Sequence, residues 1–168
     1  WIVLSLGGHH YREPLLHAVL ALARQTPQWT YTLLTSLPCE HIPANVQILA
    51  GLSDCSGHFK AADVVITQAG HSTAMELLTL GKPSIVVPDA NQMEQENNAQ
   101  RLQELGAAIR VPYSRLSAAR LRDAIETLLH RGSHWQKAAE LGRLAADIHG
   151  AKNAATVLRE FAQRLTAY

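Results

Sequence analysis

The chain has 168 residues, 47% of them hydrophobic, and a formal net charge of +1 from 15 basic and 14 acidic side chains. This length and apolar content predict one domain with a well-buried core. The balanced charge gives no electrostatic field suited to wrapping nucleic acid or lying on anionic lipid, so neither partner is expected.

The cysteines and the start of the chain indicate its compartment and its boundaries. Cys39 and Cys55 do not form a Cys-x-x-Cys pair, so neither a disulfide framework nor a structural zinc site is expected. No apolar run approaches the roughly 20 residues that span a bilayer, and residues 1–8 are too short and uncharged for a signal peptide. We therefore expect a cytoplasmic domain that does not insert into a membrane. Because the chain opens at Trp1, in what reads as a core strand, we also expect residues 1–168 to be a single domain from a longer, two-domain protein.

Short apolar runs alternate with helical patterns along the chain, and this alternation predicts a parallel sheet. The apolar runs cover residues 1–6, 31–36, 46–49, 63–67, 84–88 and 107–111. They are rich in Val, Ile and Leu, as parallel strands buried on both faces are. Helices are predicted at 13–24, 58–62, 73–80, 93–105 and 117–130, the last with Ser117 as its N-cap. The expected fold class is α/β, a doubly wound, Rossmann-like parallel sheet of about six strands.

A pair of helices is predicted after Gly132, over residues 134–149 and 151–165, with no strand between them. Val157, Leu158, Phe161 and Leu165 give the second helix an amphipathic stripe. Such a pair could pack on the sheet or reach across to another domain.

Three turns at the carboxyl ends of the predicted strands carry residues suited to a ligand, because ligands of open α/β sheets bind at that edge. The first turn follows the strand at 1–6, where Gly7 and Gly8, followed by His9, let the backbone approach a ligand closely. A simple tight turn explains a bare Gly-Gly about as well.

The second turn, AGHST at 69–73, places Gly70 and several free amide groups at the start of a helix. Unpaired donors and the helix dipole favour an anionic phosphate there. Thr73 and Glu76 also fit an S/T-x-x-E capping box, so spacing alone leaves a ligand contact and a helix cap about equally open for Glu76.

The third turn precedes the helix at 93–105. Leu102 and Leu105 mark its inward face, and the same stripe reaches Asn98 and Gln95 toward the helix start. The inward face therefore turns polar beside the second turn. Solvation of the helix start is the alternative explanation.

No metal site is expected from the nine histidines, because none forms His-Glu-x-x-His and Gly132 separates His130 from His134. The sequence also has no P-loop and no Gly-x-Ser-x-Gly elbow.

An ordered set of motifs resembles the C-terminal, donor-binding half of GT-B nucleotide-sugar glycosyltransferases. It resembles above all the family 28, MurG-like type and the related UDP-glycosyltransferases. The motifs are Gly70-x-x-Thr73-x-x-Glu76, Leu80-Gly81-Lys82-Pro83, Val87-Pro88 and Glu94-Gln95-x-x-Asn98-Ala99. The resemblance covers most of the chain, and it also accounts for the abrupt start, because in these enzymes an acceptor-binding domain precedes this one.

The resemblance implies a role for each matching residue. The amides of Gly70, His71, Ser72 and Thr73 hold the diphosphate of a UDP-sugar, and Glu76 accepts hydrogen bonds from the ribose. The backbone of Leu52 reads the uracil edge. Glu94 and Gln95 contact the donor sugar, and Asn98 supports the turn that carries this Glu-Gln pair.

Two positions depart from the family pattern. The first turn continues as His9-His10-Tyr11 where MurG-like enzymes have Gly-Gly-Ser-x-Gly, and Gln68 stands where many UDP-glycosyltransferases have histidine. Both departures bear on the acceptor and the sugar, and neither bears on the nucleotide.

The resemblance implies an inverting, metal-independent glycosyltransferase that passes a hexosyl group from a UDP-sugar to an acceptor hydroxyl and needs no cofactor. The general base would come from the N-terminal domain, so the chain alone would bind nucleotide without transferring sugar. Two alternatives are a nucleotide-sugar hydrolase on the same scaffold, like the enzyme that releases UDP in pseudaminic acid synthesis, and a single-domain subunit that needs a partner chain. A doubly wound domain whose second turn binds nothing is the remaining alternative.

Overall fold

The structure, a computed structural model, describes residues 1–6 and 13–165. Its strands form one sheet in which every neighbouring pair is parallel. They are β1 (Ile2–Ser5), β2 (Tyr31–Leu34), β3 (Val46–Leu49), β4 (Val64–Thr67), β5 (Ser84–Val86) and β6 (Ala108–Arg110). The order β3-β2-β1-β4-β5-β6 reverses direction between β1 and β4. The predicted doubly wound parallel sheet is therefore confirmed.

Alternate residues of each central strand point to opposite faces of the sheet, and both faces are apolar. In β1, Ile2 and Leu4 belong to one buried cluster, whereas Val3 belongs to another. In β4, Ile66 lies in the first cluster and Val65 in the second. This period of two, with apolar residues at every step, is what a strand covered on both faces requires.

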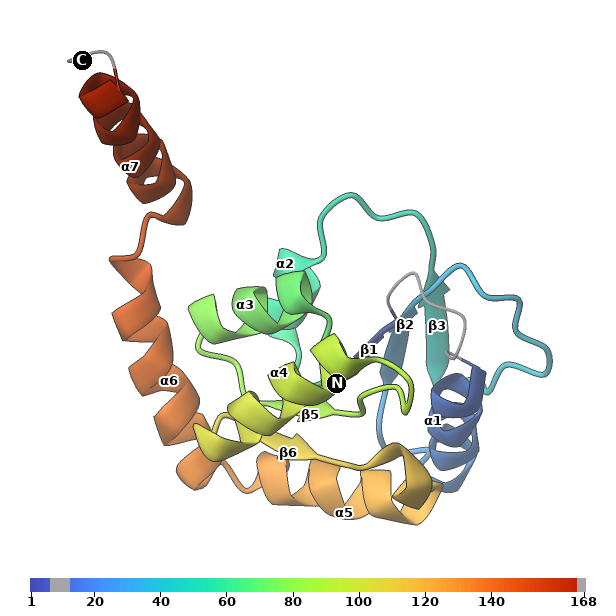
Figure 1. Ribbon diagram of the computed structural model, residues 1–168. Coiled ribbons are helices and arrows are strands. Elements are labelled where there is room, and N and C mark those ends of the chain that lie inside the picture. Colours follow the sequence, from blue (N-terminus) through green and yellow to red (C-terminus); the bar gives the residue numbers. More distant parts are fainter. Residues whose placement is uncertain (7–12, 166–168) are drawn as a thin grey trace.

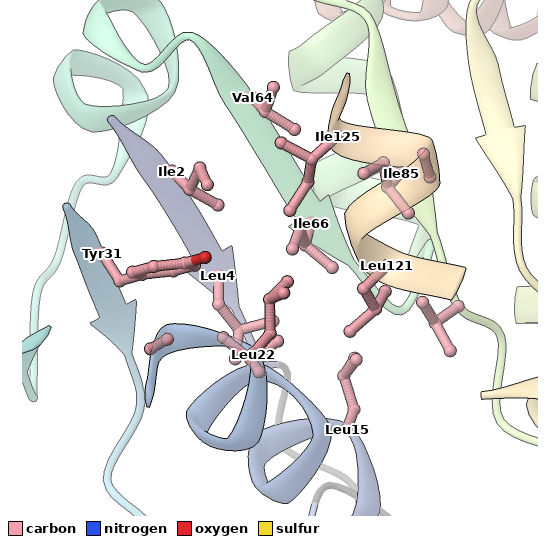
Figure 2. Packing of buried hydrophobic residues seen from close by; sticks show 14 of the residues in the cluster. Ile2, Leu4, Leu15, Leu22, Tyr31, Val64, Ile66, Ile85, Leu121 and Ile125 are labelled. Atoms are coloured by element: carbon pink, nitrogen blue, oxygen red, sulfur yellow. The ribbon is translucent and has the colours of Figure 1, made fainter. Parts of the chain in front are cut away.

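Helices cover both faces (Figure 1). The first cluster packs the sheet against α1 (Glu13–Gln25) and α5 (Ala118–Leu129). Figure 2 shows Leu15 and Leu22 of α1 and Leu121 of α5 facing the strand residues. The opposite face is covered by α2 (Ser56–Ala61), α3 (His71–Thr79) and α4 (Met93–Glu104). The carboxyl ends of the strands thus open between two helical layers.

Most predicted helices are found within two residues of their expected bounds. Ser117 is the N-cap of α5, and its side chain accepts a hydrogen bond from the Arg120 amide at 3.2 Å, as predicted. A short 3₁₀ helix, η1 (Tyr113–Arg115), was not predicted. Leu102 is buried, but Leu105 is 44% exposed because α4 ends at Glu104, so Leu105 does not mark the inward face.

The two C-terminal helices are α6 (Ser133–Ala146) and α7 (Gly150–Leu165), and they differ in how closely they pack against the rest of the domain. α6 packs closely along α3: a Cβ on Gly142 would lie 2.8 Å from the Cα of Gly81, just after α3. α7 extends away from the sheet (Figure 1), and its Val157, Leu158 and Phe161 are 61–68% exposed. None of the helices within the described ranges is long and apolar enough to cross a membrane.

Candidate functional site

The reversal of strand order places the carboxyl ends of β1 and β4 side by side, since Ser5 pairs with Thr67. In a doubly wound sheet this is the edge at which ligands bind. The loop after β1 contains Gly7, Gly8 and His9, the predicted ligand-facing turn, and it lies outside the described residues. The turn after β4 is described in full.

The turn from β4 into α3 has an unusual backbone at Ala69. This residue is completely buried and has a φ of 60°. A left-handed conformation costs a residue with a side chain about 1–2 kcal/mol, so it persists only where neighbours hold it. Asn98 does so, because its Nδ2 donates to the carbonyl oxygen of Ala69 at 3.0 Å. Asn98 of α4 thus supports the turn from β4 into α3.

Asn98→Ala is expected to lower the free energy of unfolding by about 1–2 kcal/mol, because it leaves the Ala69 carbonyl without its donor. Urea denaturation followed by circular dichroism measures the change. Asn97→Ala is the matched control, since the exposed Asn97 makes no comparable contact within the described ranges, and it should not lower stability. An equal loss in both variants would contradict the assigned role.

α3 begins with backbone amides that its own turn does not pair. Gly70 is the N-cap and offers no side-chain cap. Its carbonyl oxygen accepts from Ala74, whereas the amides of Ser72 and Thr73 find no acceptor within the described part of the chain. A Cβ built on Gly70 would meet nothing within 4 Å. Two free donors at the positive end of a helix, beside open space, suit an anion.

The capping-box interpretation of Thr73 and Glu76 is wrong. α3 begins at His71, so Thr73 is the third residue of the helix and Glu76 lies past its middle. A capping box needs its Ser or Thr at the N-cap, which is Gly70 here. The carboxylate of Glu76 therefore has no capping role at the start of this helix.

Glu76 is half-buried and lies near a second acid. Burial, and then repulsion from Asp54, raise the pKa of Glu76. Asp54 is exposed, and the hydrogen bond that it accepts from Ser56 lowers its own pKa. Leu52 lies in the same loop with its side chain 41% exposed. Glu76, Asp54 and the Leu52 loop thus share one side of the site, with a carboxylate that can accept hydrogen bonds from hydroxyl groups.

The segment from β5 to α4 is held by side chains of the first turns of α4. Gln95 is buried, and its Oε1 accepts from the Asp89 amide at 2.9 Å. Asp89 Oδ1 accepts from the Asn91 amide at 3.1 Å. Glu94 is exposed, and its Oε1 accepts from the His71 amide at 3.1 Å. Gly70 to Thr73, Glu94 and Asn98 therefore meet around one turn, with Gln95 just behind it.

Two buried polar atoms near this turn have no hydrogen-bond partner among residues 1–6 and 13–165, and they follow adjacent strands. Gln68 Oε1 follows β4, and Asp89 Oδ2 follows β5; their residues are 3% and 1% exposed. An unpaired buried acceptor costs about 1–3 kcal/mol and calls for a functional explanation. Asp89 was not among the predicted site residues, although an acid directly after Pro88, at the end of the predicted strand 84–88, is a signal that could have found it.

The described residues contain no group of three or more His, Cys, Asp or Glu side chains arranged to hold a metal ion. His71 is exposed at the first position of α3. The backbone amides of Ser72 and Thr73 are groups that the site offers to an anion.

Comparison with known proteins places the chain in a family. Residues 30–156 match the glycosyltransferase family 28 C-terminal domain. A protein of Methanosarcina mazei described as an uncharacterized glycosyltransferase is 36% identical over 156 residues, which cover 90% of this chain and 41% of the relative. A Caldicellulosiruptor saccharolyticus protein is 30% identical over 176 residues, which cover 95% of this chain and 47% of the relative. That protein is named a UDP-N-acetylglucosamine–N-acetylmuramyl-(pentapeptide) pyrophosphoryl-undecaprenol N-acetylglucosamine transferase. The chain thus spans less than half the length of these relatives.

Solved structures share the fold over almost the whole chain. The glycotransferase of kitacinnamycin superposes with a TM-score of 0.79 at 25% identity, covering 95% of this chain and 42% of that one. The calicheamicin glycosyltransferase gives a TM-score of 0.82 at 21% identity, covering 98% and 43%. At 21% identity, the similarity to the calicheamicin glycosyltransferase shows a shared fold and nothing further.

Proposed function

This chain belongs to the glycosyltransferase family 28 C-terminal domain family, the nucleotide-sugar donor-binding half of GT-B glycosyltransferases, and we propose that its donor is a UDP-sugar. One observation carries the proposal. The amides of Ser72 and Thr73, which have no acceptor within the described ranges, lie on the same helix as the half-buried carboxylate of Glu76, at the switch point of the sheet. A nucleoside diphosphate would bind to both groups at once, with its diphosphate on the amides and its ribose on the Glu76 carboxylate.

The base and the ribose distinguish a UDP-sugar from other donors. Uridine has two ribose hydroxyls for Glu76, whereas deoxythymidine has one, so Glu76 favours UDP over dTDP. The Caldicellulosiruptor relative is named for a UDP-sugar. A rhamnosyltransferase with the same fold was solved with thymidine diphosphate, at 22% identity. The backbone of the exposed Leu52 is the proposed reader of the uracil edge.

The reaction that we propose is inverting, metal-independent transfer of a hexosyl group to an acceptor hydroxyl. Negative charge builds up on the diphosphate as the bond to the sugar breaks. The amides and dipole of α3 stabilise that charge without moving, which is how fixed donors lower a barrier. Glu94 and Gln95 are the proposed contacts to the sugar. Gln95 Oε1 is already bonded to the Asp89 amide, which leaves its Nε2 as the donor.

The general base and the acceptor site are proposed to lie outside this chain, in an N-terminal acceptor-binding domain or a partner chain. The exposed apolar stripe of α7, with Val157, Leu158 and Phe161, supports a contact with such a domain. The chain alone is then expected to bind the donor and to transfer no sugar.

Isothermal titration of the 168-residue chain tests the proposal, with UDP as ligand and dTDP, CMP and ADP as comparisons. We expect saturable binding of UDP, weaker binding of dTDP, and much weaker binding of CMP and ADP. Binding of all four nucleotides with one affinity would contradict the base and ribose contacts. A folded chain that binds none of them would contradict the proposal as a whole.

A further inference from the structure

The carboxylate of Glu94 occupies the first amide of the proposed diphosphate site. Its Oε1 accepts from the His71 amide at 3.1 Å, across 23 positions of sequence. The next two amides, of Ser72 and Thr73, have no acceptor in the described part of the chain. A diphosphate that binds these amides therefore meets a negative charge already bound beside it.

Glu94 can leave this amide without disturbing the helix that carries it. Its neighbours anchor the start of α4 independently: Gln95 to the Asp89 amide, Glu96 to Arg110, and Asn98 to the Ala69 carbonyl oxygen. Glu94 is exposed, and the His71 amide is its only hydrogen-bond partner within the described ranges. The side chain can thus swing while the backbone stays in place.

The two ligands that visit the site differ in what they offer to Glu94. An intact nucleotide sugar brings sugar hydroxyls, which can donate to a displaced carboxylate. The nucleoside diphosphate product brings none, and its terminal phosphate carries about one more negative charge near neutral pH, because it ionises again with a pKa near 6. The product therefore faces stronger repulsion from Glu94 with nothing to compensate it.

We propose that Glu94 makes the site discriminate between an intact nucleotide sugar and the nucleoside diphosphate that remains after transfer. With the sugar present, Glu94 releases the His71 amide and accepts from sugar hydroxyls. After transfer it returns to the amide and competes with the terminal phosphate, which favours release of the product. This inference rests on the proposed function, because it needs the diphosphate at α3.

The test compares dissociation constants for UDP and UDP-N-acetylglucosamine in the wild-type chain, in Glu94→Gln and in Glu96→Gln. Glu94→Gln should tighten UDP binding by about three- to tenfold, because the substitution removes a negative charge that repels the diphosphate at a partly exposed site. It should change the nucleotide-sugar constant less, so the preference for the intact donor shrinks. Glu96→Gln removes the same charge two residues away, from a side chain that faces Arg110, and should leave the preference unchanged.

The possible results separate this inference from the function on which it rests. Equal changes for both ligands in Glu94→Gln, weaker UDP binding in that variant, or the same shift in Glu96→Gln would overturn the role of Glu94 and leave the donor site intact. A folded wild-type chain that binds neither ligand would overturn both. Circular dichroism confirms that each variant is folded before it is titrated.

Discussion

Glu76→Gln is expected to weaken UDP binding by at least about tenfold, because a charged acceptor of ribose hydrogen bonds contributes roughly 1.5–3 kcal/mol. Calorimetric titration at pH 7 measures the loss. The matched control is Glu126→Gln, which makes the same change on the exposed face of α5 and should leave UDP binding unaltered. A folded Glu76→Gln chain that binds UDP as tightly as the wild type would place the ribose elsewhere.

The same variant is expected to be no less stable than the wild type at neutral pH. The pKa of Glu76 is raised, chiefly by burial, so the folded chain holds this proton more tightly than the unfolded chain. The stabilisation that comes with the protonated Glu76 is fully present below the pKa of this side chain in the unfolded chain. It is lost as the pH rises through the raised pKa of Glu76 in the folded chain. Glutamine keeps the neutral form at every pH, so it should raise the midpoint of thermal unfolding at pH 7 and leave it nearly unchanged in acid. A helix cap would give the opposite sign, a loss of stability on substitution.

UDP affinity should follow the same ionisation. The ionised carboxylate accepts hydrogen bonds from the ribose hydroxyls more strongly than the neutral acid does, so acidification through the raised pKa of Glu76 should weaken UDP binding. The decline should be shallower in Glu76→Gln, in which no carboxyl titrates at this position. If UDP affinity declines equally in the wild type and in Glu76→Gln, the titrating group is not Glu76.

Gly142→Ala is expected to lower the free energy of unfolding by about 1–3 kcal/mol, as overpacking of a close contact does. The new Cβ would lie 2.8 Å from both the Cα and the N of Gly81, and 3.2 Å from the carbonyl oxygen of Leu78. These are backbone atoms, so the contact is relieved only if α6 moves away from α3.

Gly57→Ala is the matched control for this prediction. Gly57 lies in α2, and a Cβ there meets nothing within 4 Å. Alanine should therefore raise stability, by up to about 1 kcal/mol from helix propensity. Chemical denaturation of the two variants should thus give opposite signs. A neutral or stabilising Gly142→Ala would mean that α6 does not pack against the end of α3 as closely as described.

Local patterns were enough to predict the strands and the α-helices of the fold, but not the short helix η1. Continuous apolar runs predicted the strands, because each central strand is covered on both faces: Val3 and Leu4 lie in different buried clusters. Ser117 was recognisable as a cap because its contact with Arg120 lies within one turn. Such short-range contacts depend on sequence spacing alone.

The arrangement of the site depended on contacts that spacing does not encode. Thr73 and Glu76 match a capping box, yet α3 begins two residues earlier, because the left-handed Ala69 turns the chain directly into Gly70. Asn98 holds that turn from 29 positions away. The bond from the His71 amide to Glu94 likewise arises where two strand ends meet. So do the buried acceptors of Gln68 and Asp89, which have no partner in the part of the chain that the structure describes. Motif resemblance selected Glu94, and the inward stripe of the predicted helix together with the resemblance selected Asn98, but neither predicted these contacts.

The most direct test of the donor site follows the backbone amides of the 168-residue chain by proton–nitrogen correlation spectroscopy during titration with UDP. If the α3 N-terminus holds the diphosphate, the amide signals of Gly70, His71, Ser72 and Thr73 should shift most and saturate together with the calorimetric binding curve. The same signals should stay in place on addition of uridine, which has no phosphate. UDP-induced shifts that spare these four amides would contradict the assignment of the phosphate site.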